Sequence, residues 1–186
     1  MAWPVAFGMA AIAEKMIPWY LGSEFEPSIY AMMILAPIIV AIAASSLSAN
    51  QYFLATNQTR IMTISYSFSA VLNLIINALL IPGYGFVGAA IGTIAAEYSV
   101  FVIQYYVMNK QIPIIAEMLH CLKYAFYSCI MFVVVWMFGK HSIPSVMTTM
   151  IQTCIGIVIY MVCLVITKDN FIFLMFNNII HRRKNK

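Results

Sequence analysis

Charged side chains are scarce in this sequence of 186 residues, where Asp, Glu, Lys and Arg make up 9% and hydrophobic residues 63%. A soluble domain has about 25% charged residues, which cover its water-facing surface. The composition therefore excludes an ordinary soluble domain and indicates a membrane protein. The net charge of +4 would fit a nucleic-acid binder, but four of the positive charges lie at the very end of the chain: Arg182, Arg183, Lys184 and Lys186. A basic tail beside a membrane segment marks the cytoplasmic side instead, so no nucleic-acid partner is predicted.

Motifs for catalysis, cofactors and metals are also lacking. The cysteines fall in or beside apolar runs, without a C-x-x-C pair, as small hydrophobic residues do: Cys121, Cys129, Cys154 and Cys163. The sequence has no nucleotide-binding loop, no metal-ligand cluster and no nucleophile with a neighbouring base. No basic segment or cleavage site of a signal peptide follows Met1. We therefore predict a protein that is not an enzyme and that has no catalytic residue, cofactor or metal.

Long apolar segments are abundant, and about six of them could cross ~30 Å of hydrocarbon as helices. We expect the helices at about 2–21, 29–53, 62–81, 86–108, 121–139 and 145–167. A membrane barrel would show short alternating segments instead. The predicted fold is an all-α integral membrane protein, with a bundle over 1–167 and a basic cytoplasmic tail over 168–186.

The basic residues predict how the chain is oriented in the membrane. If the six segments alternate in direction, four basic positions and the tail share one side: Arg60, Lys110, Lys123 and Lys168. The other side carries Glu24, Glu26 and a single lysine, Lys140. Because cytoplasmic loops carry an excess of Lys and Arg, the C-terminus is expected in the cytoplasm, with the tail against the inner leaflet.

Two charged residues interrupt the first segment, and a proline interrupts the second. Glu14 and Lys15 point about 100° apart on a helix, so they cannot both enter one pore. Lys15 lies within a turn of Trp19 and can extend its amine to the interface. Glu14 is either a pathway residue or an interfacial partner of Lys15. In the second segment, Pro37 removes a backbone hydrogen bond and predicts a kink.

A polar stripe runs along the third segment. Its members recur at every fourth position and drift by about 120° in all: Ser65, Ser69, Asn73 and Asn77. Such a stripe can hold helices together, at under about 1 kcal/mol per contact, or it can line a hydrated cavity. The two amides favour the cavity, so Asn73 and Asn77 are candidate residues of a substrate or ion pathway.

The fourth segment is predicted to have two opposite faces. A small-residue face suits close helix packing and contains Gly88, Gly92, Ala95 and Ser99. The opposite face is expected to line the pathway and contains Thr93, Glu97 and Gln104.

Glu97 is the least expected residue of the chain. A charge at the bilayer centre costs at least ~2.5–3.5 kcal/mol, so an intramembrane acid is a functional hypothesis by default. Glu97 lies about halfway through its segment, near the depth at which transporters place substrate and ion sites. It is a candidate proton carrier. The alternative is a structural carboxyl group that is hydrogen-bonded to Asn73, Asn77 or a hydroxyl group.

Residues 73–97, NLIINALLIPGYGFVGAAIGTIAAE, resemble a pattern of polysaccharide and O-antigen flippases in the multidrug/oligosaccharidyl-lipid/polysaccharide exporter superfamily. The run LGSEF at residues 21–25 also resembles this family, as do Gln51, Tyr52 and Leu54 followed by Arg60. The resemblance extends from about residue 18 to residue 108.

The resemblance implies a transporter that flips undecaprenyl-diphosphate-linked oligosaccharide across the bacterial cytoplasmic membrane by alternating access. Family members have two six-helix lobes, often with two further helices, and the segments here are similar to the ninth to fourteenth. The chain is then expected to be the C-terminal part of a 12 to 14 helix exporter, or to work with a partner subunit. Family cavities place cationic side chains against the diphosphate, and Arg60 or Lys15 could do so here.

Two other functions stay open. A small-molecule or drug antiporter of the same superfamily would share the helices and differ in its cavity lining. A non-transporting membrane subunit would instead dock through the glycine face of the fourth segment.

Overall fold

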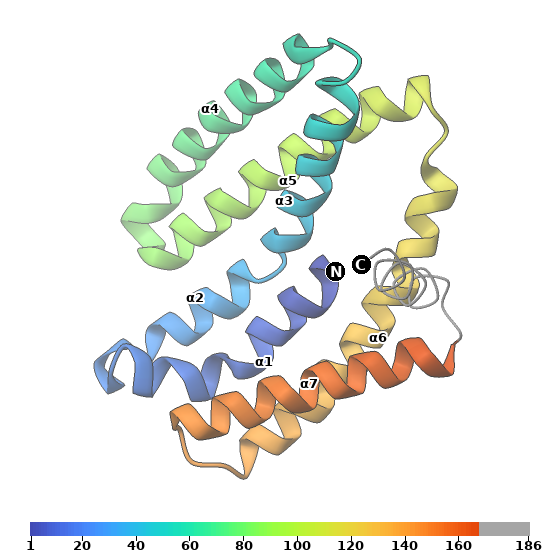
Figure 1. Ribbon diagram of the computed structural model, residues 1–186. Helices are drawn as coiled ribbons and strands as arrows, with labels where there is room; N and C mark the ends of the chain where they lie inside the picture. The colour runs from blue at the N-terminus through green and yellow to red at the C-terminus, as the bar shows by residue number, and fades with distance from the viewer. Residues whose placement is uncertain (168–186) are drawn as a thin grey trace, which may run out of the picture.

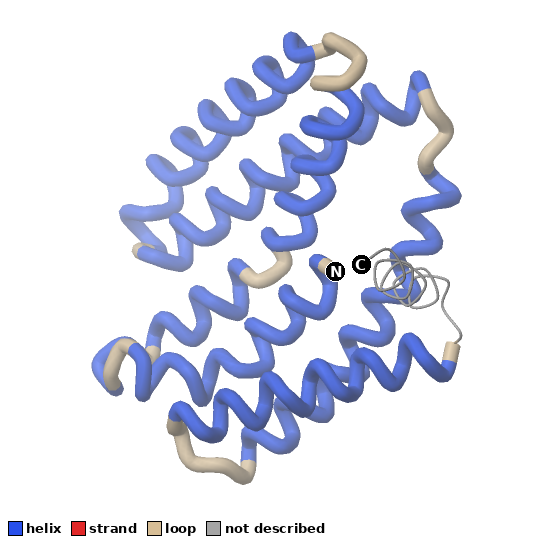
Figure 2. The backbone as a smooth tube through the Cα atoms, viewed as in Figure 1, coloured by secondary structure: helices blue, strands red, loops and turns tan. Residues whose placement is uncertain are grey.

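The computed structural model describes residues 1–167, apart from the side chains of residues 116 and 117 (Figures 1 and 2). This range is built from helices and short loops, without a strand. The helices are α1 (Ala2–Tyr20), α2 (Pro27–Leu35), α3 (Ile38–Leu47), α4 (Thr59–Tyr84), α5 (Phe86–Gln111), α6 (Ile115–Lys140) and α7 (Val146–Ile166). A short 3-10 turn, Ser23–Phe25, precedes α2, and a π-helical turn, Ser48–Phe53, follows α3. The predicted basic tail and Lys168 lie outside the described residues.

Five helical stretches of the described chain are long and apolar enough to cross a membrane, judged by length and composition. They are Pro27–Phe53, Thr59–Tyr84, Phe86–Gln111, Met118–Lys140 and Val146–Ile166. The predicted all-α membrane fold is confirmed. The first predicted segment forms a helix of 19 residues, α1, that is not among the five stretches, and Glu14 and Lys15 lower its hydropathy.

The second predicted segment, Pro27–Phe53 among the five stretches, is broken in its middle, as Pro37 predicted. α2 ends at Leu35 and α3 begins at Ile38. Across the break the backbone bonds span three residues, with Val40 N donating to the Pro37 carbonyl oxygen at 3.1 Å. The Tyr98 hydroxyl of α5 donates to the same oxygen at 3.3 Å. Proline has no N–H for the ladder, so α2 and α3 are two half-helices joined at a bend.

The helices form two groups that meet at α1. In one group α4 packs along α5, and α5 packs against α2 and α3. In the other group α1 packs against α6 and α7, and α1 also contacts α2 and α3. The buried core of the second group consists of Ala11, Met131, Val135, Tyr160 and Leu164.

The helices alternate in direction along the chain when α2 and α3 are counted as one stretch. The connections after α1, α4 and α6 lie at the lower left of Figure 1, and those after α3 and α5 lie at the upper right. Glu24 and Glu26 belong to the first end, whereas Arg60 and Lys110 belong to the second. The side of the membrane that each end faces stays a prediction.

Candidate functional site

The polar stripe of α4 lies against α5. Ser65 and Gln104 are fully buried, and the Gln104 side-chain amide donates to the Ser65 hydroxyl oxygen at 3.0 Å. One turn further along α4, the Ser69 hydroxyl donates to the Ala96 carbonyl oxygen at 2.8 Å. These two contacts place the serine half of the stripe in a helix-to-helix interface, as the packing interpretation expects.

The asparagine half of the stripe continues the same contact. The Asn77 side-chain amide donates to the Asn73 side-chain oxygen at 2.8 Å. The other polar atom of Asn77, Oδ1, is buried without a partner among the described atoms. A Cβ atom added at Gly92 would overlap this oxygen. Asn77 therefore occupies the space that the missing side chain of Gly92 leaves.

The face of α5 that packs on α4 differs from the predicted one. Five of the six buried residues of α5 recur at every fourth position: Gly88, Gly92, Ala96, Val100 and Gln104. The sixth, Ala90, lies outside this row. Such a row drifts by about 40° at each step, so its ends lie about 160° apart on a straight helical projection. When rows of this spacing on two helices pack against each other, the line of contact turns around each helix together with the row. It does not run parallel to the helix axis.

Gln104 lies far around α5 from Gly88, as the projection predicts, but it also packs on α4. Gln104 belongs to the packing row, because that row turns around α5 along its length. Ala95 and Ser99, which were expected on the packing face, are half-buried and lie outside the row. Ala96 and Val100 take their place, with exposed fractions of 5% and 1%.

Glu97 lies beside this row and is half-buried. Within the described part of the chain, no hydrogen bond or ion pair reaches its carboxylate. The alternative of a bond to Asn73 or Asn77 is therefore not observed, because Asn77 donates to Asn73 instead. Thr93, one turn earlier, is also half-buried, and its hydroxyl donates to a carbonyl of its own helix at 2.9 Å. An unpartnered carboxylate in a spanning helix can take up a proton or a cation.

The structure thus divides the predicted site residues into two sets. Asn73, Asn77 and Gln104 belong to the α4–α5 contact, whereas Thr93 and Glu97 lie beside it. A pathway role for these five residues stays a prediction.

The remaining candidates are distant from one another in the fold. Glu14 and Lys15 are half-buried on α1 and form no ion pair in the described structure. The stem of Lys15 packs near Gly139 of α6 instead. Arg60 is exposed in the first turn of α4, at the end of the molecule that also carries Lys110.

One buried polar residue of α7 was not predicted. Gln152 is fully buried, and its amide donates to the Val135 carbonyl oxygen at 3.1 Å while its own oxygen has no partner among the described atoms. Nearby, the Trp19 indole N–H donates to the Thr149 hydroxyl oxygen at 2.9 Å and ties α1 to α7. The spacing of Thr149, Gln152 and Thr153 on one helical face could have indicated this contact.

These features define an all-α membrane protein whose α4–α5 hairpin carries a partnerless acid beside a polar helix contact. Among known proteins, the chain is similar to the "Probable low-salt glycan biosynthesis flippase Agl15" of the archaeon Haloferax volcanii, with 36% identity over 96 residues. The match covers 48% of this chain and 19% of that protein, so it spans about a fifth of the relative's length. No protein-family model and no solved structure matches the chain. The similarity supports a flippase family, whereas the superfamily and a C-terminal position stay predictions.

Proposed function

We propose that this chain is part of a membrane transporter that flips a lipid-linked glycan between leaflets. The observation that carries this proposal is the 36% identity over 96 residues to a probable glycan biosynthesis flippase. The all-helical fold with five potential membrane crossings supports it. Transport, rather than an enzymatic reaction, is the activity that such a relative suggests.

We further propose that the substrate is an undecaprenyl-diphosphate-linked oligosaccharide, the repeat unit of a polysaccharide or O-antigen. It moves from the inner to the outer leaflet of the cytoplasmic membrane by alternating access. Because the match spans about a fifth of the relative, we assign this activity to a complete transporter, in which the chain would work together with an N-terminal half or a partner subunit. A bacterial inner membrane stays a prediction, since the relative is archaeal.

Within such a transporter, Glu97 is the proposed carrier of a proton or coupling ion. Thr93 lies one turn away and is the nearest polar candidate on the same helix. Arg60 would meet the diphosphate at the cytoplasmic end. For Asn73, Asn77 and Gln104 to reach the pathway, α4 would have to move away from α5 in another state of the transporter.

The test replaces Glu97 by glutamine in the complete transporter. Glu97→Gln keeps the shape and removes the ionisable group, so we expect surface glycan export to be lost while membrane insertion is unchanged. Glu26→Gln is the matched control, because Glu26 is exposed in the loop before α2. Normal export by Glu97→Gln would show that the acid only fills space.

A deletion strain separates the two transport functions. Loss of surface polysaccharide supports the glycan flippase, and the strain should accumulate lipid-linked glycan on the inner leaflet. Drug sensitivity with normal surface polysaccharide would support the antiporter of the same superfamily instead.

A further inference from the structure

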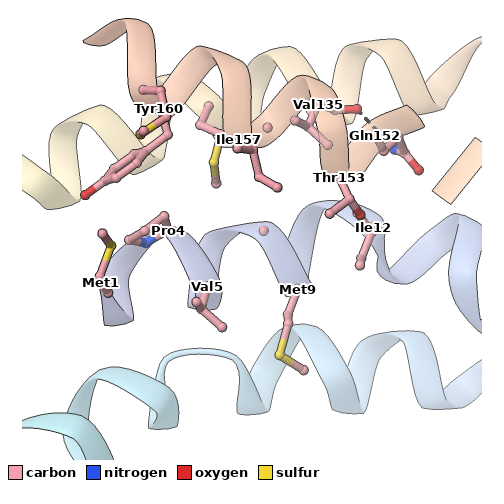
Figure 3. A pocket seen from close by; sticks show the side chains of 14 residues that line it. Met1, Pro4, Val5, Met9, Ile12, Val135, Gln152, Thr153, Ile157 and Tyr160 are labelled. Carbon is pink, nitrogen blue, oxygen red and sulfur yellow. Dashed lines mark hydrogen bonds between the residues drawn. The ribbon is translucent and has the colours of Figure 1, made fainter. Parts of the chain in front are cut away.

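An apolar groove of about 430 Å³ separates the first half of α1 from α7, with α6 as its floor (Figure 3). In Figure 3, Met1 and Pro4 of α1 lie on the side of Tyr160 and Ile157 of α7, whereas the side chains of Val5 and Met9 point away from α7. Three of its lining side chains are polar, Gln152, Thr153 and Tyr160. The Gln152 amide already donates to Val135, and the Thr153 hydroxyl donates to its own helix at 2.8 Å. Such walls suit hydrocarbon rather than sugar.

A glycine keeps the groove open. A Cβ atom at Gly8 would first meet a methionine side chain, the Cε atom of Met131, at 3.8 Å, which is an ordinary contact distance. By contrast, a Cβ atom at Gly88 would lie 2.6 Å from the backbone of Leu80. Gly88 is therefore required by close packing of two helices, whereas Gly8 leaves space that a larger side chain could fill.

The groove is about as deep as one leaflet. Its α1 wall runs from Met1 to Ile12, which is ~16 Å at 1.5 Å per residue. Half of a ~30 Å hydrocarbon core is ~15 Å. The rim residues Val5 and Ile157 are 51% and 60% exposed, so the groove opens sideways to the surface that a bilayer would cover.

The groove continues toward a positive charge. A smaller cavity of about 110 Å³ shares Met1 and Tyr160 with it and reaches Tyr124 of α6. The amine of the neighbouring Lys123 lies 4.8 Å from the centre of the Tyr124 ring. The cavity wall itself contains the two phenol rings, and Lys123 lies beyond Tyr124 rather than in that wall. A basic group near the end of an apolar channel suits an amphiphile with an anionic head.

We propose that this groove holds one hydrocarbon chain of an anionic glycerolipid whose headgroup lies against Lys123 and Tyr124. The lipid would fill the space between α1 and α7 as a structural component of the fold. This inference does not depend on the proposed flippase activity, because it concerns a resident membrane lipid and not the transported substrate.

The test measures lipid retention by the full 186-residue chain, purified in detergent and incubated with dioleoyl phosphatidylglycerol, by native mass spectrometry. We expect the wild type to retain one lipid and Gly8→Leu to lose it, because the new side chain fills the groove. Gly83→Leu is the matched control, since Gly83 is exposed and has nothing within 4 Å of an added Cβ atom. Ile157→Trp, at the exposed rim, gives a second blocking variant should Gly8→Leu fail to fold.

The headgroup contact is tested with dioleoyl phosphatidylcholine as a zwitterionic competitor. Lys123→Gln should remove the preference for phosphatidylglycerol, whereas Lys110→Gln should keep it. Lys110 is the matched control for Lys123, because its amine also lies over a tyrosine ring, 4.2 Å from the centre of the Tyr106 ring. Lys110 is on α5 and does not line the groove. Wild-type retention by folded Gly8→Leu and Ile157→Trp would overturn the proposal. Retention of a polyprenyl phosphate but not of phosphatidylglycerol would also overturn it, by giving the groove to a different lipid.

Discussion

At the scale of single residues, two glycines of the α4–α5 hairpin have opposite roles. A Cβ atom at Gly88 would lie 2.6 Å from the Leu80 carbonyl carbon and 2.7 Å from its oxygen, so the backbone of α4 would have to shift. Gly83, near the end of α4, has nothing within 4 Å of an added Cβ atom. Replacement by alanine should therefore affect the stability of the protein differently at the two positions.

We predict that Gly88→Ala lowers the stability of the protein, whereas Gly83→Ala does not. Overpacking costs about 1–3 kcal/mol, and the better helix propensity of Ala returns up to about 1 kcal/mol. A net loss of about 1–2 kcal/mol would lower the thermal midpoint by several degrees for a chain of this size. Thermal unfolding in one detergent measures both variants. An equal midpoint for both would mean that α4 and α5 are further apart at Gly88 than described.

At the scale of elements, the α4–α5 hairpin depends on one buried amide. The Gln104 amide donates to Ser65, but its oxygen has no partner among the described atoms. Ser65 has a bond of its own, because its hydroxyl donates to the Met62 carbonyl oxygen at 2.9 Å. The two partners of this contact are therefore not equally costly to remove.

We predict that Ser65→Ala destabilises the hairpin and that Gln104→Leu does not. Ser65→Ala leaves the Gln104 amide buried and unpaired, which costs about 1–3 kcal/mol. Gln104→Leu removes the donor and the unpaired oxygen together. The double variant should regain the stability that Ser65→Ala loses, which a double-mutant cycle of thermal midpoints detects. Additive effects would instead show that the two side chains do not interact.

The same hairpin shows how far helical periodicity predicts a site. The spacing of Ser65, Ser69, Asn73 and Asn77 correctly indicated one stripe, because the α-helical repeat fixes which residues share a face. It did not indicate what the stripe touches. The contact of Gln104 with α4 was not predicted, because a straight projection ignores the way a contact row turns around a helix. Glu97 could be singled out from its place in an apolar segment, but its lack of a bonding partner required the structure.

At the scale of the whole molecule, composition predicted the fold class but not the grouping of the helices. Apolar length alone identifies spanning segments, whereas the choice of neighbours depends on contacts between residues far apart in the chain. α1 packs on α6 and α7, more than a hundred residues away, and the bond between Trp19 and Thr149 ties it there. No local pattern in α1 indicates these partners. The groove between α1 and α7 was for the same reason not predictable from the sequence.

The charges at the two ends of the bundle predict the orientation of the whole chain in the membrane. Arg60 and Lys110 lie at one end of the bundle and Glu24 and Glu26 at the other, so the first end is expected in the cytoplasm. In a variant without the native cysteines, Ala55→Cys should react with a membrane-impermeant maleimide only after the cells are permeabilised. His141→Cys, in the exposed connection between α6 and α7, should react in intact cells.

A second pair of cysteines tests α1, which is not among the five stretches that are apolar enough to cross. Its 19 residues would extend for ~28 Å, close to the ~30 Å of a hydrocarbon core. Its contacts with α6 and α7 hide part of its surface from lipid, so a full crossing does not require that every side chain be apolar. We therefore predict that Ala2→Cys reacts like Ala55→Cys and that Ser23→Cys reacts like His141→Cys. Labelling of both ends of α1 from the same side would mean that the helix lies in the interface, and the groove that it forms with α7 would then face the headgroups rather than the lipid chains.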